Sequence, residues 1–377
     1  MKKFSLLLIS TYGVGLGLWR QKGLYDREIG YYKKLGKFLD RFGVLSYDRA
    51  DGKPEGELYE HFYNRFRLPK MLFSFLAPLL FIRAFKKYGV IRTNQFAGAW
   101  TAALMKLFSS KKLFIMRGGH AWDYESGSRF ARWCADRLTA WSLRMADSVF
   151  FVSSEDQEKY LKRYGEHNRK KMRILPNAVD TSVFSYEPRR PDRISRILLI
   201  GRLVEMKNFQ SVLQAVVAMD ERLRKQVSID IIGEGEYRST LESIVREHGL
   251  PATFHGVLPN DQMAAFLKRS DIFIMPQTYG SGMSKGILEA MATGNIVIAS
   301  DLPAHRNTID EGINGLICKF DTASIRERIE YVLARIDAKD MVRMRAVAAE
   351  KVRTSFSMET IAEREYGYLV ELTKKQA

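Results

Sequence analysis

Two basic residues, Arg202 and Lys207, stand close together in the segment GRLVEMKNF and are the first candidates for chemistry. The apolar run Ile197–Gly201 before them predicts a strand, and ligands of parallel α/β sheets bind at the carboxyl ends of strands. Arginine can bridge two phosphate oxygens and lysine adds a mobile point charge, so the pair suits a diphosphate. Two solvated surface cations would have the same composition. The pair alone therefore indicates a candidate anion site and leaves that alternative open.

A second candidate segment, QTYGSGMSKGILEAMATG, joins a glycine-rich loop to a short predicted helix. Gly280, Gly282 and Ser284 leave room for backbone amides to approach an anion, and the positive end of the helix dipole adds to the attraction. Glu289 lies early in this helix, where a carboxylate can accept hydrogen bonds from two sugar hydroxyls. An ordinary loop and an exposed helix charge are the alternatives. Together with the basic pair, the segment favours a nucleotide or sugar diphosphate site.

The elements that must position these residues follow from an alternation of short apolar runs with amphipathic stretches. This alternation predicts parallel sheets with crossover helices, arranged in two series. The first series of expected strands is Phe4–Ser10, Val90–Asn94, Leu113–Arg117, Ser148–Val152 and Met172–Leu175. The second series is Ile197–Gly201, Ser228–Ile232, Thr253–His255, Asp271–Met275, Ile296–Ala299 and Gly315–Cys318.

The break between the two series falls at SYEPRRPDRIS, where two prolines interrupt the periodicity, so we expect a linker near Pro188–Arg193. This predicts an N-terminal domain over residues 1–188 and a C-terminal domain over 193–357. The amphipathic segment at about 358–377 has no strand after it. It could pack on either domain, and we assign it to the first.

The whole excess of positive charge, +17, lies in residues 1–190. Between Glu60 and Asp123 there are eleven basic residues and no acidic residue. Such an asymmetry predicts an anionic partner, which could be a lipid surface, a phosphorylated substrate or nucleic acid. Nucleic acid has only the charge in its favour, since no recognisable reading motif is present, and we expect no nucleic-acid partner.

The most apolar run of the chain is Met71–Ile82, MLFSFLAPLLFI, with basic residues on both sides. It is too short to span a bilayer, which takes about 20 residues. A helix lying on anionic lipid and a core helix with basic ends both fit this pattern. Only two cysteines are present, and no cleavage-site pattern follows the first apolar run. We therefore expect a cytoplasmic protein, and the lipid-bound alternative for this helix would make it peripheral at the inner face of the membrane.

The chain resembles the family 4 retaining glycosyltransferases, most specifically over about Val152–Phe320. The resemblance rests on GRLVEMKNF, IIGEGEYRSTLE, FHGVLPNDQMAAFLKRSDIFIMP and GSGMSKGILEAMATGNIVIASDLP, in the family's order and spacing. It implies the GT-B fold, an α/β architecture of two Rossmann-like domains with parallel sheets facing a central cleft. In this fold the N-terminal domain would bind the acceptor and the C-terminal domain the nucleotide sugar. It also implies that Arg202 and Lys207 bind the donor diphosphate and Glu289 the nucleotide ribose. The loop residues implied near the diphosphate and sugar are Gly282, Met283, Ser284, Lys285 and Gly286.

The resemblance also suggests roles for residues of the N-terminal half. His120, in FIMRGGHAWDYE, stands where family members often place a histidine near the donor sugar, so we count it as catalytic with Arg202 and Lys207; an ordinary loop histidine is the alternative. Gly15 or Gly17 could let the backbone approach the leaving phosphate. The candidates for contact with the acceptor are Trp19, Arg20, Asn94, Gln95 and Arg117, with Asp123 at the same crevice mouth. Asn94 and Gln95 could equally cap the following helix.

The implied reaction is a retaining transfer of a hexose from a UDP- or GDP-linked sugar to a hydroxyl of a glycan or lipid-linked glycan. The second glutamate of the family's pair is replaced by Ser281, so a non-catalytic nucleotide-sugar-binding protein is the alternative. No D-x-D pair occurs and the six histidines are scattered, so we expect neither a metal nor another cofactor. Arg202, Lys207 and helix dipoles would then stabilise the diphosphate.

Overall fold

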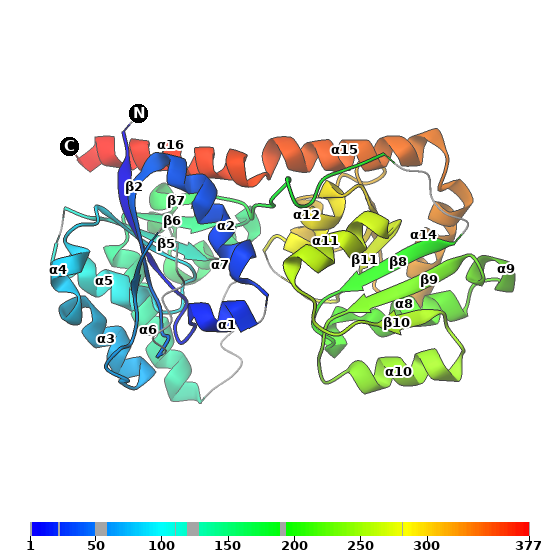
Figure 1. The fold of residues 1–377 in the computed structure, drawn as a ribbon, viewed down its shortest axis with the longest axis horizontal. Helices are drawn as coiled ribbons and strands as arrows, with labels where there is room; N and C mark the ends of the chain where they lie inside the picture. The colour runs from blue at the N-terminus through cyan, green and yellow to red at the C-terminus, as the bar shows by residue number, and fades with distance from the viewer. Residues whose placement is uncertain are drawn as a thin grey trace. The chain divides into compact units, whose positions relative to one another are not determined.

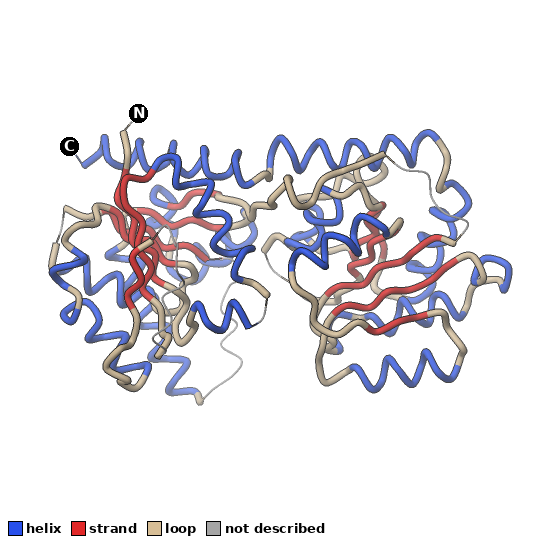
Figure 2. The backbone as a smooth tube through the Cα atoms, in the orientation of Figure 1, coloured by secondary structure: helices blue, strands red, loops and turns tan. Residues whose placement is uncertain are grey.

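The computed structural model describes residues 2–21, 23–49, 59–109, 111–118, 128–188, 194–280 and 282–376. The chain divides into two compact units, one formed by Met1–Pro176 with Ile361–Ala377 and the other by Asn177–Thr360 (Figure 1). Each unit contains one parallel sheet surrounded by helices (Figure 2). The predicted α/β class with two parallel sheets is therefore confirmed. Residues 189–193 of the expected linker lie outside the described part of the chain.

The first unit is built on a seven-stranded sheet in the order β3-β2-β1-β4-β5-β6-β7. Its strands are β1 (Phe4–Ile9), β2 (Leu39–Leu45), β3 (Glu60–Phe62), β4 (Val90–Thr93), β5 (Leu113–Gly118), β6 (Ser148–Phe151) and β7 (Met172–Ile174). Its helices are α1 (Leu16–Gln21), α2 (Tyr25–Leu35), α3 (Lys70–Leu80), α4 (Ile82–Phe85), α5 (Ala99–Leu107), α6 (Arg129–Met145) and α7 (Ser154–Tyr164). The strand order reverses between β1 and β4, which makes this point a switch in topology.

The second unit has a six-stranded sheet in the order β10-β9-β8-β11-β12-β13, with its own switch between β8 and β11. Its strands are β8 (Ser195–Ile200), β9 (Val227–Ile232), β10 (Ala252–Phe254), β11 (Ile272–Met275), β12 (Ile296–Ser300) and β13 (Leu316–Cys318). Its helices are α8 (Phe209–Val217), α9 (Glu221–Arg224), α10 (Arg238–Glu247), α11 (Asn260–Arg269), α12 (Lys285–Ala292), α13 (Pro303–Arg306), α14 (Thr322–Arg335) and α15 (Lys339–Ser355).

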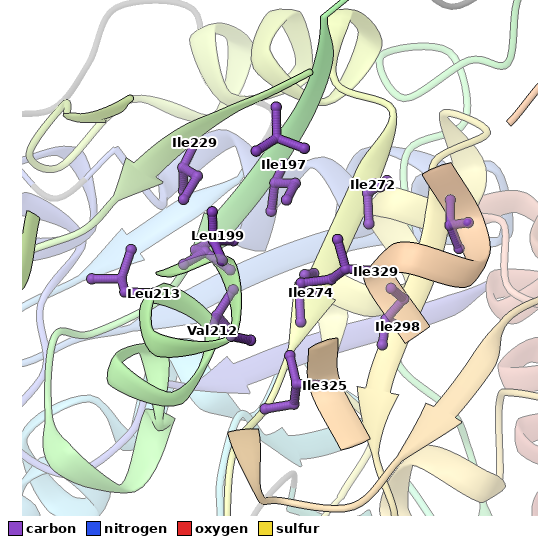
Figure 3. Packing of buried hydrophobic residues seen from close by; sticks show 14 of the residues in the cluster. Ile197, Leu199, Val212, Leu213, Ile229, Ile272, Ile274, Ile298, Ile325 and Ile329 are labelled. Carbon is purple, nitrogen blue, oxygen red and sulfur yellow. The ribbon is translucent and has the colours of Figure 1, made fainter. Parts of the chain in front are cut away.

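The core of the second unit explains why its strands read as apolar runs. Ile197 and Leu199 of β8 pack with α8 and α14 on one face of the sheet, through residues such as Val212 and Ile325 (Figure 3). Leu198, between them on β8, packs in a separate cluster that includes residues of α12. A central strand of a parallel sheet is buried on both faces, so consecutive rather than alternating residues are apolar.

The last helix, α16 (Met358–Gln376), belongs to the first unit from Ile361 onward. Glu365 of this helix and Arg92 of β4 are both 0% exposed, and Arg92 Nε lies 2.9 Å from Glu365 Oε1. Tyr31 of α2 donates a hydrogen bond to the other carboxylate oxygen of Glu365. The ring of Tyr366 stacks on Phe38 with 4.4 Å between centroids. The first unit is thus completed by the segment at the far end of the sequence.

Candidate functional site

The loops that follow β8 and β11 are tied together at the topological switch of the second sheet. Thr278 N donates to Met206 O at 3.0 Å, and Asn208 Nδ2 donates to Pro276 O at 3.1 Å. Asn208 is buried and has a φ of 56°, in the left-handed region that asparagine tolerates better than most residues. These contacts fix the turn that carries the two basic candidates at the carboxyl edge of the sheet.

Arg202 and Lys207 lie on either side of this turn, as the sequence predicts. Arg202 is exposed, whereas Lys207 is partly buried at the end of a short 3-10 turn, Glu205–Lys207. Burial lowers the pKa of the Lys207 ammonium, and the nearby positive charge of Arg202 lowers this pKa further. The two cations are therefore close enough to repel each other. A polyanion bound beside them would relieve that repulsion.

Two glycines allow the turn after β8 to sit against the loop after β9. A Cβ at Gly233 would lie 1.8 Å from the carbonyl oxygen of Gly201, and one at Gly235 would lie 2.2 Å from the carbonyl oxygen of Leu203. The backbone of the turn after β8 therefore contacts the backbone of the loop after β9, and Leu203 N donates to Glu234 O at 2.9 Å. The glycines of the IIGEGEY segment consequently serve to place the loop that carries Arg202.

The loop before α12 is held by a cap and by one long-range hydrogen bond. Ser284 is the N-cap of α12, and its Oγ accepts from Ile287 N at 3.4 Å. Asn177 Nδ2 donates to Met283 O at 2.7 Å. Gly282 has a φ of 76°, which favours glycine at this position. The loop therefore delivers the start of α12 to the same edge of the sheet as the basic pair.

Three further candidates lie on α12 itself. Lys285 and Gly286 form its first turn and are partly buried. Glu289 is 3% exposed, so it is not a solvated surface charge. Its assignment to the ribose stays a prediction, as do the donor roles of Lys285 and Gly286. Ser281, which replaces the second glutamate of the family's pair, lies outside the described residues.

In the first unit, the amides near Gly15 and Gly17 already have an anionic partner. Leu16 N and Gly17 N donate to Asp48 Oδ2 and Oδ1 at 2.6 and 3.1 Å. A Cβ at Gly15 would lie 2.0 Å from Asp48 Oδ1, so the carboxylate fits closely against this glycine. The phosphate approach predicted at Gly15 and Gly17 stays a prediction, and a phosphate there would compete with Asp48.

The candidates for acceptor contact occupy different environments. Trp19 is only 6% exposed, and the guanidinium of Arg20 lies 4.3 Å from the centre of the Tyr25 ring. Asn94 Nδ2 lies 3.4 Å from Thr11 Oγ1, so Asn94 reaches the loop after β1 across the switch of the first sheet.

Gln95, next in the chain, is partly buried. Arg117, near the end of β5, donates through Nη2 to Pro176 O at 3.4 Å. His120 and Asp123 lie outside the described residues. The acceptor roles assigned to these residues stay predictions.

Sequence reasoning missed three polar residues at these edges, Gln277, His305 and Asp48. Gln277 closely follows β11. Because ligands of parallel sheets bind at the carboxyl ends of strands, its position in the sequence could have identified it. His305 and Asp48 carry no local signal, because their partners are brought to them only by the fold. Within the described ranges, there is no group of three or more His, Cys, Asp and Glu side chains that could hold a metal ion.

Two parallel α/β sheets, each with a switch point, are the architecture of the GT-B fold. Anabaena HepE, solved in complex with UDP, superposes with a TM-score of 0.78 at 16% identity, over 97% of this chain and 100% of that chain. A glycosyltransferase from Rickettsia africae superposes with a TM-score of 0.77 at 16% identity, over 99% of this chain and 100% of that chain. The predicted GT-B architecture is confirmed by these likenesses.

Residues 39–183 match the family described as Glycosyltransferase Family 4, and residues 186–350 match the Glycosyl transferases group 1. The predicted resemblance to the family 4 glycosyltransferases is confirmed by these two matches.

Curated relatives match part of the chain. The phosphatidyl-myo-inositol mannosyltransferase of Mycobacterium leprae is 29% identical over 182 residues, 46% of each chain. The 2-deoxystreptamine glucosyltransferase of Streptomyces kanamyceticus is 26% identical over 172 residues, 42% of this chain and 44% of that one. An uncharacterized glycosyltransferase of Methanocaldococcus jannaschii is 26% identical over 33% of this chain and 32% of that one. The chain thus spans about a third to a half of the length of these relatives.

Proposed function

We propose that the chain transfers a hexose from a UDP- or GDP-linked sugar to a hydroxyl of a glycan or lipid-linked glycan, in polysaccharide or glycolipid assembly. The observation that carries the proposal is the pair of mutually repelling cations, Arg202 and Lys207, at the switch of the second sheet. The diphosphate of the donor would neutralise both, and Glu289 would accept hydrogen bonds from the ribose hydroxyls. A structural neighbour solved with UDP and a relative described as a mannosyltransferase support this reading.

The proposed chemistry is a retaining transfer without a covalent intermediate and without a metal. The acceptor hydroxyl attacks from the face that the diphosphate leaves, and an oxygen of the departing diphosphate takes up the acceptor proton. Arg202 and Lys207 stabilise the negative charge that grows on the diphosphate as the sugar–oxygen bond breaks. The rest of the rate enhancement comes from holding donor and acceptor in a reactive geometry.

Donor binding can be tested by thermal shift with a panel of UDP, GDP and their sugars. Binding stabilises the folded state by mass action, so the true donor should raise the melting temperature. Lys207→Ala should weaken that donor at least tenfold, because one charge-assisted contact is lost. Lys225→Ala is the matched control, since Lys225 is 75% exposed, pairs with Glu221 and precedes β9, at the opposite edge of the sheet from the switch.

No shift with any nucleotide, or an equal shift in the Lys207→Ala variant, would overturn the proposed site. Transfer and hydrolysis assays with the identified donor then separate the two functions weighed from the sequence. Binding of the donor with neither transfer of its sugar to an acceptor nor hydrolysis by water would favour the non-catalytic nucleotide-sugar-binding protein.

We also propose that the first unit docks on an anionic membrane surface. The outer face of α3 is apolar, with Met71, Leu72, Phe75, Leu79 and Leu80 exposed by 36–51%. A surface helix normally presents polar residues to water, so this face is built for an apolar environment. Basic residues on either side of α3 complement anionic headgroups. No helix in the described ranges is long and apolar enough to cross a membrane.

The first turns of α6 add to this surface. Phe130 is 73% exposed and Trp133 is 56% exposed, and their rings lie 6.1 Å apart beside Arg129 and Arg132. Helices α3 and α6 both pack on α5. Each begins after a strand of a parallel sheet, so both helix starts lie at its carboxyl edge. Asn94 lies at the same edge, so docking there would present the acceptor candidates to lipid-linked substrates.

Flotation with vesicles of anionic or neutral phospholipid tests the membrane proposal. The parent should float with anionic vesicles at low salt and detach as salt rises, because screening weakens the attraction. Leu72→Asp should abolish flotation. Leu107→Asp is the matched control, because Leu107 is 59% exposed at the end of α5, on the opposite edge of the sheet. Equal loss in both variants, or no flotation of the parent, would contradict the proposal.

A further inference from the structure

Behind Lys207, a buried chain of hydrogen bonds runs through Gln277 and His305 to the backbone of β12. Lys207 Nζ lies 2.6 Å from Gln277 Oε1, and Gln277 Nε2 lies 3.2 Å from His305 Nε2. His305 Nδ1 lies 2.7 Å from Ser300 O. Gln277 is 7% exposed, and His305 is 1% exposed. The transfer chemistry proposed above uses neither of these two side chains.

The chemistry of each group fixes the direction of every hydrogen bond in this chain. A carbonyl oxygen can only accept, so His305 Nδ1 carries a hydrogen and donates it to Ser300 O. In the neutral imidazole, Nε2 is then the acceptor, and it receives a hydrogen bond from the amide nitrogen of Gln277. The amide oxygen of Gln277 consequently faces Lys207, whose ammonium can only donate. The tautomer of His305 with its hydrogen on Nδ1 therefore determines that Gln277 presents a hydrogen-bond acceptor, Oε1, to Lys207.

The surroundings hold Gln277 in this orientation. Ser300 Oγ donates to the carbonyl oxygen of Gln277 at 2.6 Å, which fixes its backbone. Gly280 leaves the space that the amide needs, because a Cβ at this position would lie 2.3 Å from Gln277 Nε2. The side chain is thus confined by its backbone, by His305 and by the loop that leads to α12.

Burial favours the neutral form of His305. Burial lowers the pKa of His305 to about 4, the hydrogen bond to Ser300 opposes this shift, and the positive charge of Lys207 adds to it. Lys207 is the charged group that acts on His305, and Arg202 acts in turn on Lys207. A protonated imidazole would turn Nε2 into a donor that faces the amide NH₂, and the Gln277 amide would have to rotate. The amide would then present a donor to Lys207, and the chain would break.

We propose that Gln277 and His305 are positioning residues that hold the Lys207 ammonium where it meets the donor diphosphate. A lysine side chain has large rotamer freedom, and holding it in the bound geometry before the ligand arrives removes part of the entropy lost on binding. The inference rests on the proposed function, since it assumes that Lys207 binds the diphosphate. It adds regulation by pH: affinity for the diphosphate falls when His305 takes up a proton.

Calorimetric titration of the full chain with UDP, GDP, inorganic pyrophosphate and the matching nucleoside tests this inference. Gln277→Leu removes both hydrogen bonds at similar volume and should weaken the diphosphates about tenfold, the effect of one hydrogen bond to a charged group. Affinity for the nucleoside, which has no phosphate, should change less than twofold. On a Lys207→Met background, Gln277→Leu should have no further effect, because the residue it positions is gone.

His305→Phe keeps an aromatic ring but can neither accept from Gln277 nor donate to Ser300 O, and it provides a second variant in case Gln277→Leu fails to fold. In the parent, affinity for pyrophosphate should fall as the pH drops from 6 towards 4, and His305→Phe should remove most of that fall. Equal losses for diphosphate and nucleoside, or additive losses with Lys207→Met, would overturn the positioning role. If the parent binds pyrophosphate through Lys207 but no nucleotide, the proposed function fails while the positioning role can still be measured.

Discussion

The buried ion pair between Arg92 and Glu365 leads to a large predicted change in stability. Glu365→Gln keeps the shape of the side chain but leaves the guanidinium of Arg92 in the interior without a counter charge. Both groups are 0% exposed and 2.9 Å apart, so no water can replace the lost partner. Removing one member of a buried pair costs about 3–5 kcal/mol. At a slope of about 2–3 kcal/mol per molar urea, the unfolding midpoint should fall by about 1–2.5 M.

Tryptophan fluorescence is the suitable assay, because all five tryptophans lie before Pro176 and report on the first unit alone. Glu371→Gln is the matched control on the same helix. The carboxylate of Glu371 pairs with Arg173 and Lys375 but is 44% exposed, and exposed pairs contribute only about 0–1 kcal/mol.

A double variant, Arg92→Met with Glu365→Met, replaces both charges by apolar groups and should be more stable than Glu365→Gln alone. The reasoning is refuted if Glu365→Gln unfolds at the urea concentration of the parent. It is refuted equally if the double variant is less stable than the single one.

Three further predictions concern single positions. Gly367 lies in α16, and a Cβ there would meet no atom within 4 Å. Gly367→Ala should therefore raise the free energy of unfolding of the first unit, followed by tryptophan fluorescence, by about 0.5–1 kcal/mol. A lower unfolding midpoint would contradict this. Burial raises the pKa of the Cys318 thiol to about 12, so alkylation of the native protein, followed by peptide mass spectrometry, should modify Cys134 and spare Cys318 until the second unit unfolds. Folding lowers the pKa of His305 from its ordinary 6.5 to about 4. Between these two pH values the imidazole takes up a proton more readily in the unfolded chain than in the folded protein. The second unit should therefore lose stability as the pH falls through this window, by at most about 1.4 kcal/mol per pH unit. Urea unfolding followed by circular dichroism should show this slope in the parent and a flatter one in His305→Gln.

The strands that sequence patterns predict correctly are those with continuous apolar runs. All eleven expected strands are present, with ends within two residues of the prediction. The strands β2 and β3 were not predicted. β2 contains the exposed residues Asp40 and Arg41, and β3 contains the partly buried residues Glu60 and His61. β3 is the edge strand of the first sheet and β2 is its neighbour, and their polar residues interrupt the apolar runs by which the other strands are recognised.

Some residues of the candidate site can likewise be predicted from the local sequence, whereas others are brought to the site only by the fold. Arg202 and Lys207 lie in the turn after β8, and the loop before α12 follows β11, so the carboxyl-end rule locates them. Gln277 is 70 residues from Lys207 and 28 residues from His305, and only the sheet order brings the three together. The pairing of Asp48 with the amides after Gly15 likewise joins residues about 30 positions apart. Such tertiary contacts leave no periodic trace in the sequence.

The return of α16 to the first unit affects the order in which a nascent chain can mature. When all seven strands of the first sheet have been translated, Glu365 has not. Arg92 therefore has no counter charge until the second unit has also been translated. The second unit is continuous in sequence and can fold as soon as it emerges. Although domains usually mature from the N-terminus during synthesis, in this protein the half that is made first is expected to be finished last.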